Sequence, residues 1–397
     1  MKPSDPSGAD RARTGLPPLV WALGFVSLLA DVSSELVHPL LPLFVVGTLG
    51  APATVLGLIE GSADALASLA KGWAGLRSDR SRRRLPYVRW GYALPMLGKA
   101  VISLATTWPV VYSGRLLDRL GKGLRTAPRD ALLADAAPSG QRGAAFGLHR
   151  ALDHCGALLG SAAAVALLAL GWPLARIFVL AAVVGLAAWL MTLRLREPDV
   201  PARVAADVKS ERLPPAYWRA LALLSVPALG QCGVAFVLLR MVNLGWPAWQ
   251  VVSAYACVYA IAALTSTPFG RFCDARGRRA ALGLGWTMFA LADLGLARPD
   301  LAGPWLPLAL YGAAVGASEG AARAWLADFS PHARRGAGLG VSAALIGVAQ
   351  LAGGLGAGLL WDFGSPAHPF YVAAAASLAA SALLLCFRGA RFSVTPS

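Results

Sequence analysis

Charged residues are scarce in this chain: Asp, Glu, Lys and Arg make up 14% of its 397 residues, while 56% are hydrophobic. Soluble domains carry about 25% charged residues, so this composition excludes an ordinary soluble protein. Several apolar runs approach or exceed the roughly 18 to 20 residues that a helix needs to span a bilayer. The sequence therefore predicts an all-α membrane protein that crosses the lipid bilayer many times.

Cysteines are few, and the common catalytic motifs are absent. The five cysteines are scattered along the chain, and no two of them have the spacing of metal ligands. This pattern supports neither a disulfide framework nor a zinc site. The chain has no phosphate-binding loop ending in GK[ST], no nucleophile elbow and no zinc-protease helix. We therefore expect no enzyme activity, no cofactor and no metal site.

Acidic residues are outnumbered by basic ones, 21 against 36, which gives a formal net charge of +15. In a soluble chain such an excess would suggest nucleic-acid binding. Here the basic residues gather in alternate loops, and we expect no nucleic-acid partner. The loops without Lys or Arg lie near residues 50, 108, 172, 246 and 365. By the positive-inside rule both termini are cytoplasmic, as in a multi-pass protein of the bacterial inner membrane.

Twelve apolar segments, joined by turns that contain Pro or Gly, are expected to be spanning helices. They cover residues 17–47, 52–77, 85–107, 109–136, 143–170, 173–194, 216–243, 248–272, 279–298, 303–328, 337–361 and 367–388. One long polar connection divides them into two halves of six. We expect a cytoplasmic N-terminal tail at 1–16, an N-terminal six-helix bundle at 17–194, a cytoplasmic linker at 195–215, a C-terminal six-helix bundle at 216–388 and a cytoplasmic C-terminal tail at 389–397.

An internal repeat supports the two halves. The segment GLRSDRSRRR, which begins at Gly75, aligns with GRFCDARGRR, which begins at Gly270. Further along, LADAAPSGQRGA aligns with LADFSPHARRGA at nearly the same offset. Repeated helical units of this kind are typical of transporters, whose substrate site lies near mid-membrane between the halves.

The two aligned loops resemble the loop motif of the major facilitator superfamily, G-x-x-x-D-[RK]-x-G-[RK]-[RK], and the resemblance covers nearly the whole chain. It implies twelve transmembrane helices in two pseudo-symmetric six-helix bundles. The matching residues are Gly75, Asp79, Arg80 and Arg83 in the first half and Gly270, Asp274, Gly277 and Arg278 in the second. The resemblance implies that these loops latch one conformation of a transporter, although they also suit a role that only orients the helices.

Two further spans resemble drug/proton antiporters of that superfamily. The fourth span matches an Arg-bearing motif, R-x-x-x-x-x-G-x-G, at Arg115, Gly121 and Gly123, and the resemblance implies a role for this Arg in proton coupling. The fifth span partly matches an antiporter motif but carries Ser161 where the motif has Pro. The resemblance implies a proton-coupled antiporter of small organic compounds.

The fourth span also carries a charged stripe. One sector of its helical wheel, about 120° wide, holds Arg115, Asp118, Arg119, Lys122, Arg125 and Arg129. A charge at the bilayer centre costs roughly 2.5 kcal/mol or more, so the stripe faces water, a counter-charge or a cargo. Arg119 and Lys122 are therefore candidates for contact with a substrate. The alternative is that the stripe only holds neighbouring helices through ion pairs with Asp118.

Titratable side chains inside other spans are candidates for carrying protons. The proton-coupling candidates are Asp31, Glu35, Asp64, Arg115, His149 and Asp153. His149 and Asp153 are i, i+4 neighbours on one helix face, where an Asp–His pair is able to relay a proton. Each candidate has a structural alternative as an ion-pair or packing residue.

The resemblance implies that spans one, four, seven and ten line a substrate cavity. The cavity candidates are His38, Arg119, Lys122, Arg240, Asn243, Glu319 and Arg323. Glu319 and Arg323 are i, i+4 neighbours that are able to neutralise each other.

The most specific hypothesis is a monomeric secondary transporter that exports a small organic solute against protons by alternating access. One alternative is proton-coupled uptake of an organic anion or a metal complex, favoured by the basic excess on the fourth span. An alternative of another class is a membrane sensor or assembly factor that transports nothing.

Overall fold

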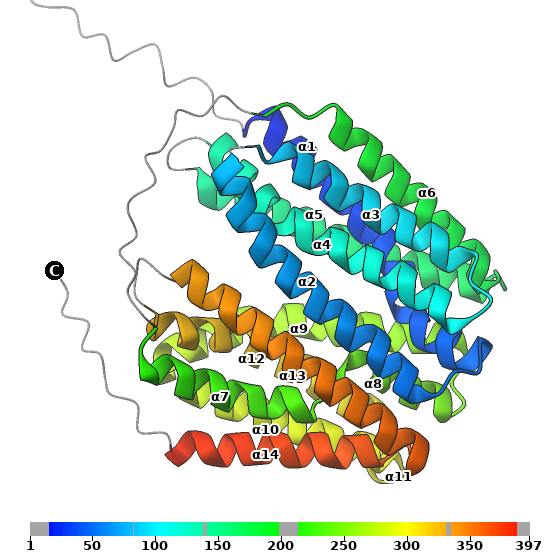
Figure 1. The fold of residues 1–397 in the computed structure, drawn as a ribbon. Coiled ribbons are helices and arrows are strands. Elements are labelled where there is room, and N and C mark those ends of the chain that lie inside the picture. The colour runs from blue at the N-terminus through cyan, green and yellow to red at the C-terminus, as the bar shows by residue number, and fades with distance from the viewer. Residues whose placement is uncertain (1–15, 82, 138–140, 198–212, 331–334, 387–397) are drawn as a thin grey trace, which may run out of the picture.

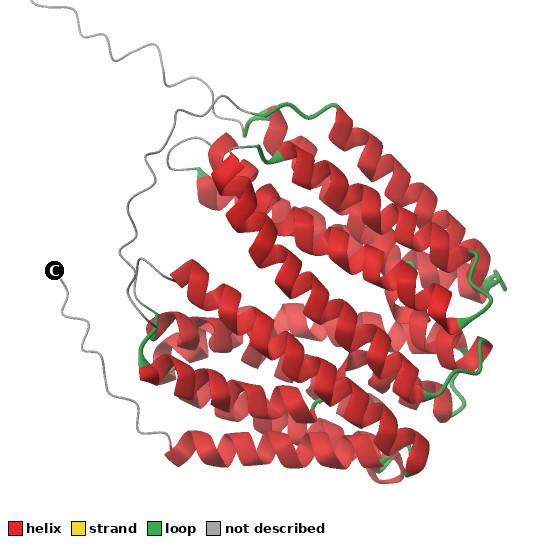
Figure 2. Cartoon of the chain, viewed as in Figure 1, coloured by secondary structure: helices red, strands yellow, loops and turns green. Residues whose placement is uncertain are grey.

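The computed structural model describes residues 16–81, 83–137, 141–197, 213–330 and 335–386. Within these ranges all regular secondary structure is helical (Figure 2), which confirms the predicted all-α class. Nine helical segments in the described part of the chain are long and apolar enough to cross a membrane. The other expected spans, at 85–107, 109–136 and 303–328, carry charged side chains within their length, which lowers their hydropathy.

The helices follow the expected spans closely. The first half contains α1 (Pro18–Glu35), the 3₁₀ turn η1 (His38–Leu40), the π-helical segment η2 (Leu43–Thr48), α2 (Ala53–Ser81), α3 (Leu85–Ser103), α4 (Trp108–Ala136), α5 (Arg142–Ala169) and α6 (Leu174–Leu193). The second half contains α7 (Pro215–Gly230), α8 (Gly233–Asn243), α9 (Ala248–Arg276), α10 (Arg278–Ala297), α11 (Pro299–Ala302), α12 (Trp305–Asp328), α13 (Arg335–Phe363) and α14 (His368–Cys386).

Two spans differ from the continuous helices that hydropathy alone predicts. The first span changes from α to 3₁₀ and π geometry around Pro39 and Pro42, because proline has no N–H to donate and its ring crowds the preceding turn. The seventh span is divided between α7 and α8. There Gln231 is extended, with ψ of 126°, and Gly233 has φ of +71°, a conformation that glycine adopts without strain.

The helices pack as two groups, α1–α6 and α7–α14 (Figure 1). In the first group α1 packs against α5 and α6, and α4 packs against α2 and α3. In the second, α12 packs against α9 and α10, and α14 packs against α7 and α10. The linker expected at 195–215 lies largely outside the described residues, so the domain boundaries stay a prediction.

The two groups meet mainly along α2 and α13, with a second contact between α5 and α9. Gly57 lies against Gly354 so closely that a Cβ on Gly57 would come within 2.0 Å of the Gly354 carbonyl oxygen. Gly358 lies equally close to the backbone of Thr54. Small residues of this kind allow helix backbones to approach each other within a membrane.

The contact between the groups is confined to one end of the molecule. We call the end where α1 and α7 begin and α14 ends the terminal face, and the other end, with the turns near Gly50 and Gly364, the opposite face. The α2–α13 contact runs from the opposite face to Gly347, and the two helices then diverge toward the terminal face (Figure 1). The structure is therefore closed at the opposite face and open at the terminal face.

An aspartate reinforces this closure. Asp362, in the last turn of α13, accepts hydrogen bonds from the backbone N–H groups of Ala53 and Thr54, both at 2.8 Å, and from the Thr54 hydroxyl at 2.6 Å. These N–H groups begin α2 and have no partner inside that helix. A carboxylate at a helix N-terminus also interacts favourably with the helix dipole. Asp362 thus caps a helix that belongs to the other group.

Candidate functional site

The charged stripe of α4 begins with a closed ionic network toward the opposite face. Arg115 donates from Nε and Nη2 to the two carboxylate oxygens of Glu60, at 3.0 and 2.8 Å, and from Nη1 to Asp118 at 3.1 Å. Asp118 also pairs with Lys99 at 3.3 Å, and His38 lies 3.8 Å from Glu60. Arg115, Lys99 and Asp118 are each no more than 6% exposed. Two cations thus neutralise two carboxylates, an arrangement that joins α2, α3 and α4.

The end of the stripe toward the terminal face is also paired. The Arg125 guanidinium lies over the Tyr92 ring, 4.3 Å from its centroid, which is the geometry of a cation–π contact. Arg129 donates to the Ser27 hydroxyl at 3.0 Å and to Asp130 at 2.9 Å. These contacts are the ones expected if this part of the stripe holds helices together.

The middle of the stripe is different. Arg119 has only a long contact, 3.5 Å from its Nε to Asp64, and that nitrogen is buried without a hydrogen-bond partner. The Lys122 side chain is exposed, and within the described residues its ammonium has neither an ion pair nor a hydrogen bond. These two cations are the ones left for a partner from outside the chain.

Acidic groups of α1 lie beside these cations. Asp31 and Glu35 are half-buried, and both are within electrostatic range of Lys122. No described residue forms an ion pair with Asp31, and Oε2 of Glu35 has no hydrogen-bond partner. The two carboxyl groups and the Lys122 side chain therefore lie close together and are not bonded to one another.

The second group of helices contributes two tyrosines to the same place. The Tyr255 ring on α9 lies 5.7 Å from the His38 ring, and its hydroxyl faces Glu35. The rings of Tyr255 and Tyr259 are 4.7 Å apart. We define the central cluster by Asp31, Glu35, His38, Arg119, Lys122, Tyr255 and Tyr259. Because it draws side chains from both groups of helices, it changes whenever the groups move relative to each other.

Sequence reasoning missed this role of the tyrosines. Aromatic residues in spanning helices commonly mark the membrane–water interface, so the sequence alone favours an anchoring role for Tyr255 and Tyr259. The available signal was the spacing: residues four apart lie on one helix face, and this face of α9 also carries small residues suited to close packing.

His149 and Asp153 are brought together as their spacing predicts. Nδ1 of His149 lies 3.4 Å from the Asp153 carboxylate, and the histidine is 3% exposed. The other ring nitrogen of His149 and one oxygen of Asp153 are buried without partners. The pair lies within electrostatic range of Asp31, which connects it to the central cluster.

Arg240 and Asn243 lie elsewhere. Arg240 donates to the backbone carbonyl oxygens of Leu296 and Ala297 and to the Asn243 side chain. It thereby provides hydrogen-bond donors for two carbonyl groups in the last turn of α10, near the opposite face. The structure does not bring this pair together with the central cluster, and its contact with a substrate stays a prediction.

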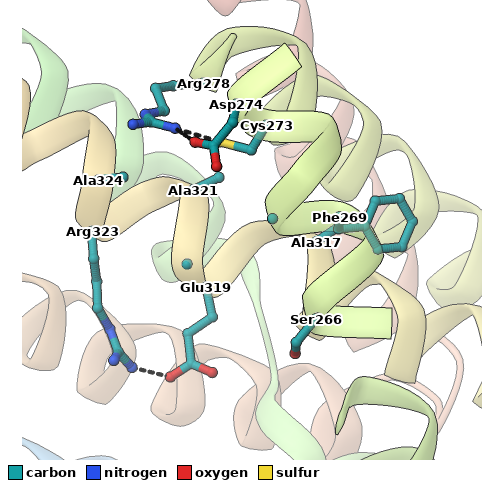
Figure 3. Close-up of a pocket in the computed structure, with 13 residues that line it drawn as sticks. Ser266, Phe269, Cys273, Asp274, Arg278, Ala317, Glu319, Ala321, Arg323 and Ala324 are labelled. Carbon is teal, nitrogen blue, oxygen red and sulfur yellow. Dashed lines mark hydrogen bonds and ion pairs between the residues drawn. The ribbon is translucent and has the colours of Figure 1, made fainter. Parts of the chain in front are cut away.

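Glu319 and Arg323 pair with each other on α12 and line a cavity of about 420 Å³ between α9, α10 and α12 (Figure 3). The latch candidates Gly270, Asp274 and Arg278 line the same cavity. Arg278 donates to Asp274 at 2.6 Å and lies 3.6 Å from Asp328. In the second half the loop motif is thus an ionic cluster at the terminal face.

The first-half loop motif is less fully described. Gly75 lies close to α4, where a Cβ on it would come within 3.2 Å of the Ala127 side chain. Arg80 and Arg83 are exposed. The side chain of Asp79 lies outside the described part of the structure. Gly277, at the corresponding loop of the second half, has φ of +91° between α9 and α10, as expected for a turn that requires glycine.

Comparison with known proteins identifies the family. The sequence profile of the Major Facilitator Superfamily matches residues 23–256 and 221–396. The chain belongs to the major facilitator superfamily. An uncharacterised transporter of this superfamily from Methanocaldococcus jannaschii is 29% identical over 381 residues, which is 92% of this chain and 94% of that protein. An uncharacterised protein of Mycobacterium tuberculosis is 30% identical, over 89% of each chain.

Solved structures of the superfamily have the same fold. The nucleoside transporter NupG superposes with a TM-score of 0.75 at 13% identity, over 93% of this chain and 99% of that one. The human organic anion transporter MFSD10 superposes with a TM-score of 0.65 at 18% identity, over 93% of this chain and all of that one, 100%. At such identities the likeness shows the fold alone. This chain is accordingly a multi-pass secondary transporter of the major facilitator superfamily and not an enzyme.

Proposed function

We propose that this major facilitator protein is a proton-coupled antiporter that exports a small organic solute across the bacterial inner membrane. The observation that carries the proposal is the central cluster, in which Asp31, Glu35 and Lys122 are close together yet unpaired. Elsewhere along α4 the charges are neutralised within the chain, as with Arg115 and Glu60. Unpaired intramembrane charges are costly and mark ion and substrate pathways.

In this proposal Asp31 and Glu35 carry the protons, and His149 with Asp153 relays them. Arg119, Lys122 and the two tyrosines of α9 hold the solute. While Asp31 and Glu35 are ionised, they also attract a cationic part of the solute, and their protonation removes that attraction. Proton binding and solute binding thus compete for the same groups, and that competition is the basis of antiport.

Alternating access then requires the two groups of helices to separate at the opposite face and close at the terminal face. The Arg278 cluster with Asp274 and Asp328 supports a latch that acts at the terminal face. The arginine-rich loops support a cytoplasmic location for that face and for both termini. The protein acts as a monomer in this proposal, since each chain supplies both halves of the site.

A second candidate function is proton-coupled uptake of an organic anion. It is favoured by one observation, the unpaired ammonium of Lys122 beside Arg119, because two adjacent cations suit a carboxylate or phosphate group. The same cluster serves both functions, and only the direction of flux differs. A membrane sensor that transports nothing would move no solute at all.

The test uses purified protein in liposomes that contain a pH-sensitive dye. Amphiphilic cations, organic anions and metal complexes are loaded inside in turn, and a proton gradient is imposed across the membrane. For antiport we expect at least one compound to increase proton flux in the wild-type protein. Asp31→Asn and Lys122→Gln should each reduce this coupled flux by about tenfold or more, which corresponds to about 1.4 kcal/mol of lost interaction.

Arg298→Gln is the matched control, because it removes an exposed cation whose ion pair, among the described residues, is with Asp300 at the opposite face. Its flux should equal that of the wild-type protein. If Asp31→Asn and Lys122→Gln also transport normally, the assignment of the central cluster is wrong. If protons accompany the solute in the same direction, the uptake function replaces export. If no compound moves protons, the coupling is rejected.

A further inference from the structure

A second acidic group lies inside the second group of helices, outside the central cluster. Asp293, on α10 in the core of the second group of helices, is 0% exposed. Neither of its carboxylate oxygens has a hydrogen-bond partner, and no described residue forms an ion pair with it. An isolated ionised carboxylate in such a place is far too costly to persist, so the group binds a cation or carries a proton.

Other buried acids of this chain show what a structural role looks like. Asp118 pairs with Lys99 and Arg115, and Asp153 pairs with His149. The contact with Lys99 joins α3 to α4, and each of these contacts gives the buried acid a partner within the chain. Asp293 has no such contact. It therefore stabilises the fold no more than an apolar side chain of similar size would.

The neighbours of Asp293 offer no counter-charge. The groups within its electrostatic range are the Cys232 thiol, at the break between α7 and α8, and the Tyr311 hydroxyl on α12. The nearest cation on α8, Arg240, is occupied by Leu296, Ala297 and Asn243. Other titratable groups on the packed helices are occupied elsewhere: Glu319 pairs with Arg323 on α12, and Asp274 and Asp328 lie beside Arg278. Tyr259 on α9 lies near Tyr311, Tyr371 on α14 lies near Arg298 and Arg240, and Asp300 on α11 pairs with Arg298.

The surroundings of Asp293 indicate whether it binds a metal cation or a proton. The Asp293 side chain is closed off from solvent, and its oxygens have no polar partners that would complete the coordination of a metal cation. A sodium or potassium ion needs several oxygen ligands, whereas a proton needs only the carboxylate itself. We propose that Asp293 is a proton-binding site in the second half of the transporter, separate from the acids of the central cluster.

In this proposal the break between α7 and α8 is the place where water reaches the site. Cys232, the neighbour of Asp293, is the residue at which α8 resumes after the extended Gln231. α7 packs against α13 and α14, whereas α8 packs against α9 and against η2 of the first group of helices. When the two groups move apart at the opposite face, α8 is pulled relative to α7 and the joint beside Asp293 opens. Asp293 therefore holds its proton in the present conformation and releases it in the other. This step rests on the proposed proton coupling.

Infrared spectroscopy of the purified protein tests the proposal without a known solute. The probe is the proton: spectra are recorded during a pH titration, and the C=O stretching band of neutral carboxylic acids is followed. The difference between wild type and Asp293→Asn should contain this band at neutral pH, and the band should vanish as the pH rises. If the difference contains no such band at any pH, the proposal is wrong.

A second arm tests the link to conformation. Gly57→Leu places a side chain where the Gly354 backbone lies, so it holds the opposite face apart. In this background the Asp293 band should vanish at a lower pH than in the otherwise wild-type protein. A band that vanishes at the same pH in both would reject the coupled site. Asp293→Glu, which keeps the acid, must shift the frequency of the band, and an unchanged frequency would also overturn the assignment.

The two hypotheses fail in different ways. If the proposed proton coupling is wrong, liposomes will show no coupled proton flux while the infrared band of Asp293 still titrates. If the Asp293 site is wrong, coupled flux will persist and the band will be absent from the difference spectrum.

Discussion

Arg115→Gln will destabilise the protein by about 3–5 kcal/mol, the range expected when one partner of a buried ion pair is removed. The substitution leaves Glu60 without its bidentate partner and leaves Asp118 with Lys99 alone. The cost arises from the uncompensated carboxylate and not from the intrinsic strength of the pair. Thermal or denaturant unfolding in detergent, followed by tryptophan fluorescence, measures the change.

Arg119→Gln is the matched control, since it removes the next arginine of the same helix. Its contact with Asp64 is 3.5 Å long, and the Asp64 side chain is 50% exposed, so we expect a change within about 1 kcal/mol. Glu60→Gln combined with Arg115→Gln should recover part of the loss, because it removes the charge that Arg115→Gln leaves buried. Equal stability of Arg115→Gln and Arg119→Gln would show that the network contributes nothing to stability.

The fold could be predicted from the sequence because a bilayer imposes a simple rule on helix length and hydropathy. The sequence also predicted α4, although its charged stripe lowers the hydropathy of that segment. The leucines on the other side of the helix recur with the helical period. The break in the seventh span was not predicted. Gly230, Gly233 and Pro227 permit such a break, but the same residues occur in continuous spanning helices, where neighbouring helices decide the outcome.

The candidate site was only partly predictable. A helical wheel identifies which charges share one side of α4, but it cannot show that Glu60 reaches Arg115 from another helix. Pairing across helices is decided by three-dimensional packing. It distinguishes Lys122, which has no partner among the described residues, from Arg115, which donates three hydrogen bonds. The contribution of Tyr255 depends on how the two halves of the chain meet, and no local pattern carries that information.

Asp362→Ala will shift the protein toward a conformation that is open at the opposite face. The aspartate accepts three hydrogen bonds from the first turn of α2, and it does so only while α2 and α13 touch. Loss of an N-terminal cap costs about 0.5–2 kcal/mol, and 1.4 kcal/mol is a factor of ten in an equilibrium constant. We therefore expect the open population to rise by roughly tenfold. Spin labels at Trp172→Cys and Leu301→Cys, in a background without other cysteines, report the distance between the two groups of helices across this face.

Asp300→Ala is the control for this measurement, because Asp300 is an acid at the same face whose ion pair, with Arg298, stays within one group of helices. It should leave the distance distribution unchanged.

Gly57→Leu acts on the same contact by steric overlap and should lengthen the distance, as Asp362→Ala does. If Gly57→Leu lengthens the distance and Asp362→Ala does not, the glycine contact alone holds the face closed. The cap would then be a consequence of closure and would not contribute to it. If Asp362→Ala lengthens the distance, one carboxylate on α13 determines part of the balance between the two conformations, and any solute or proton that changes this balance must work against that cap.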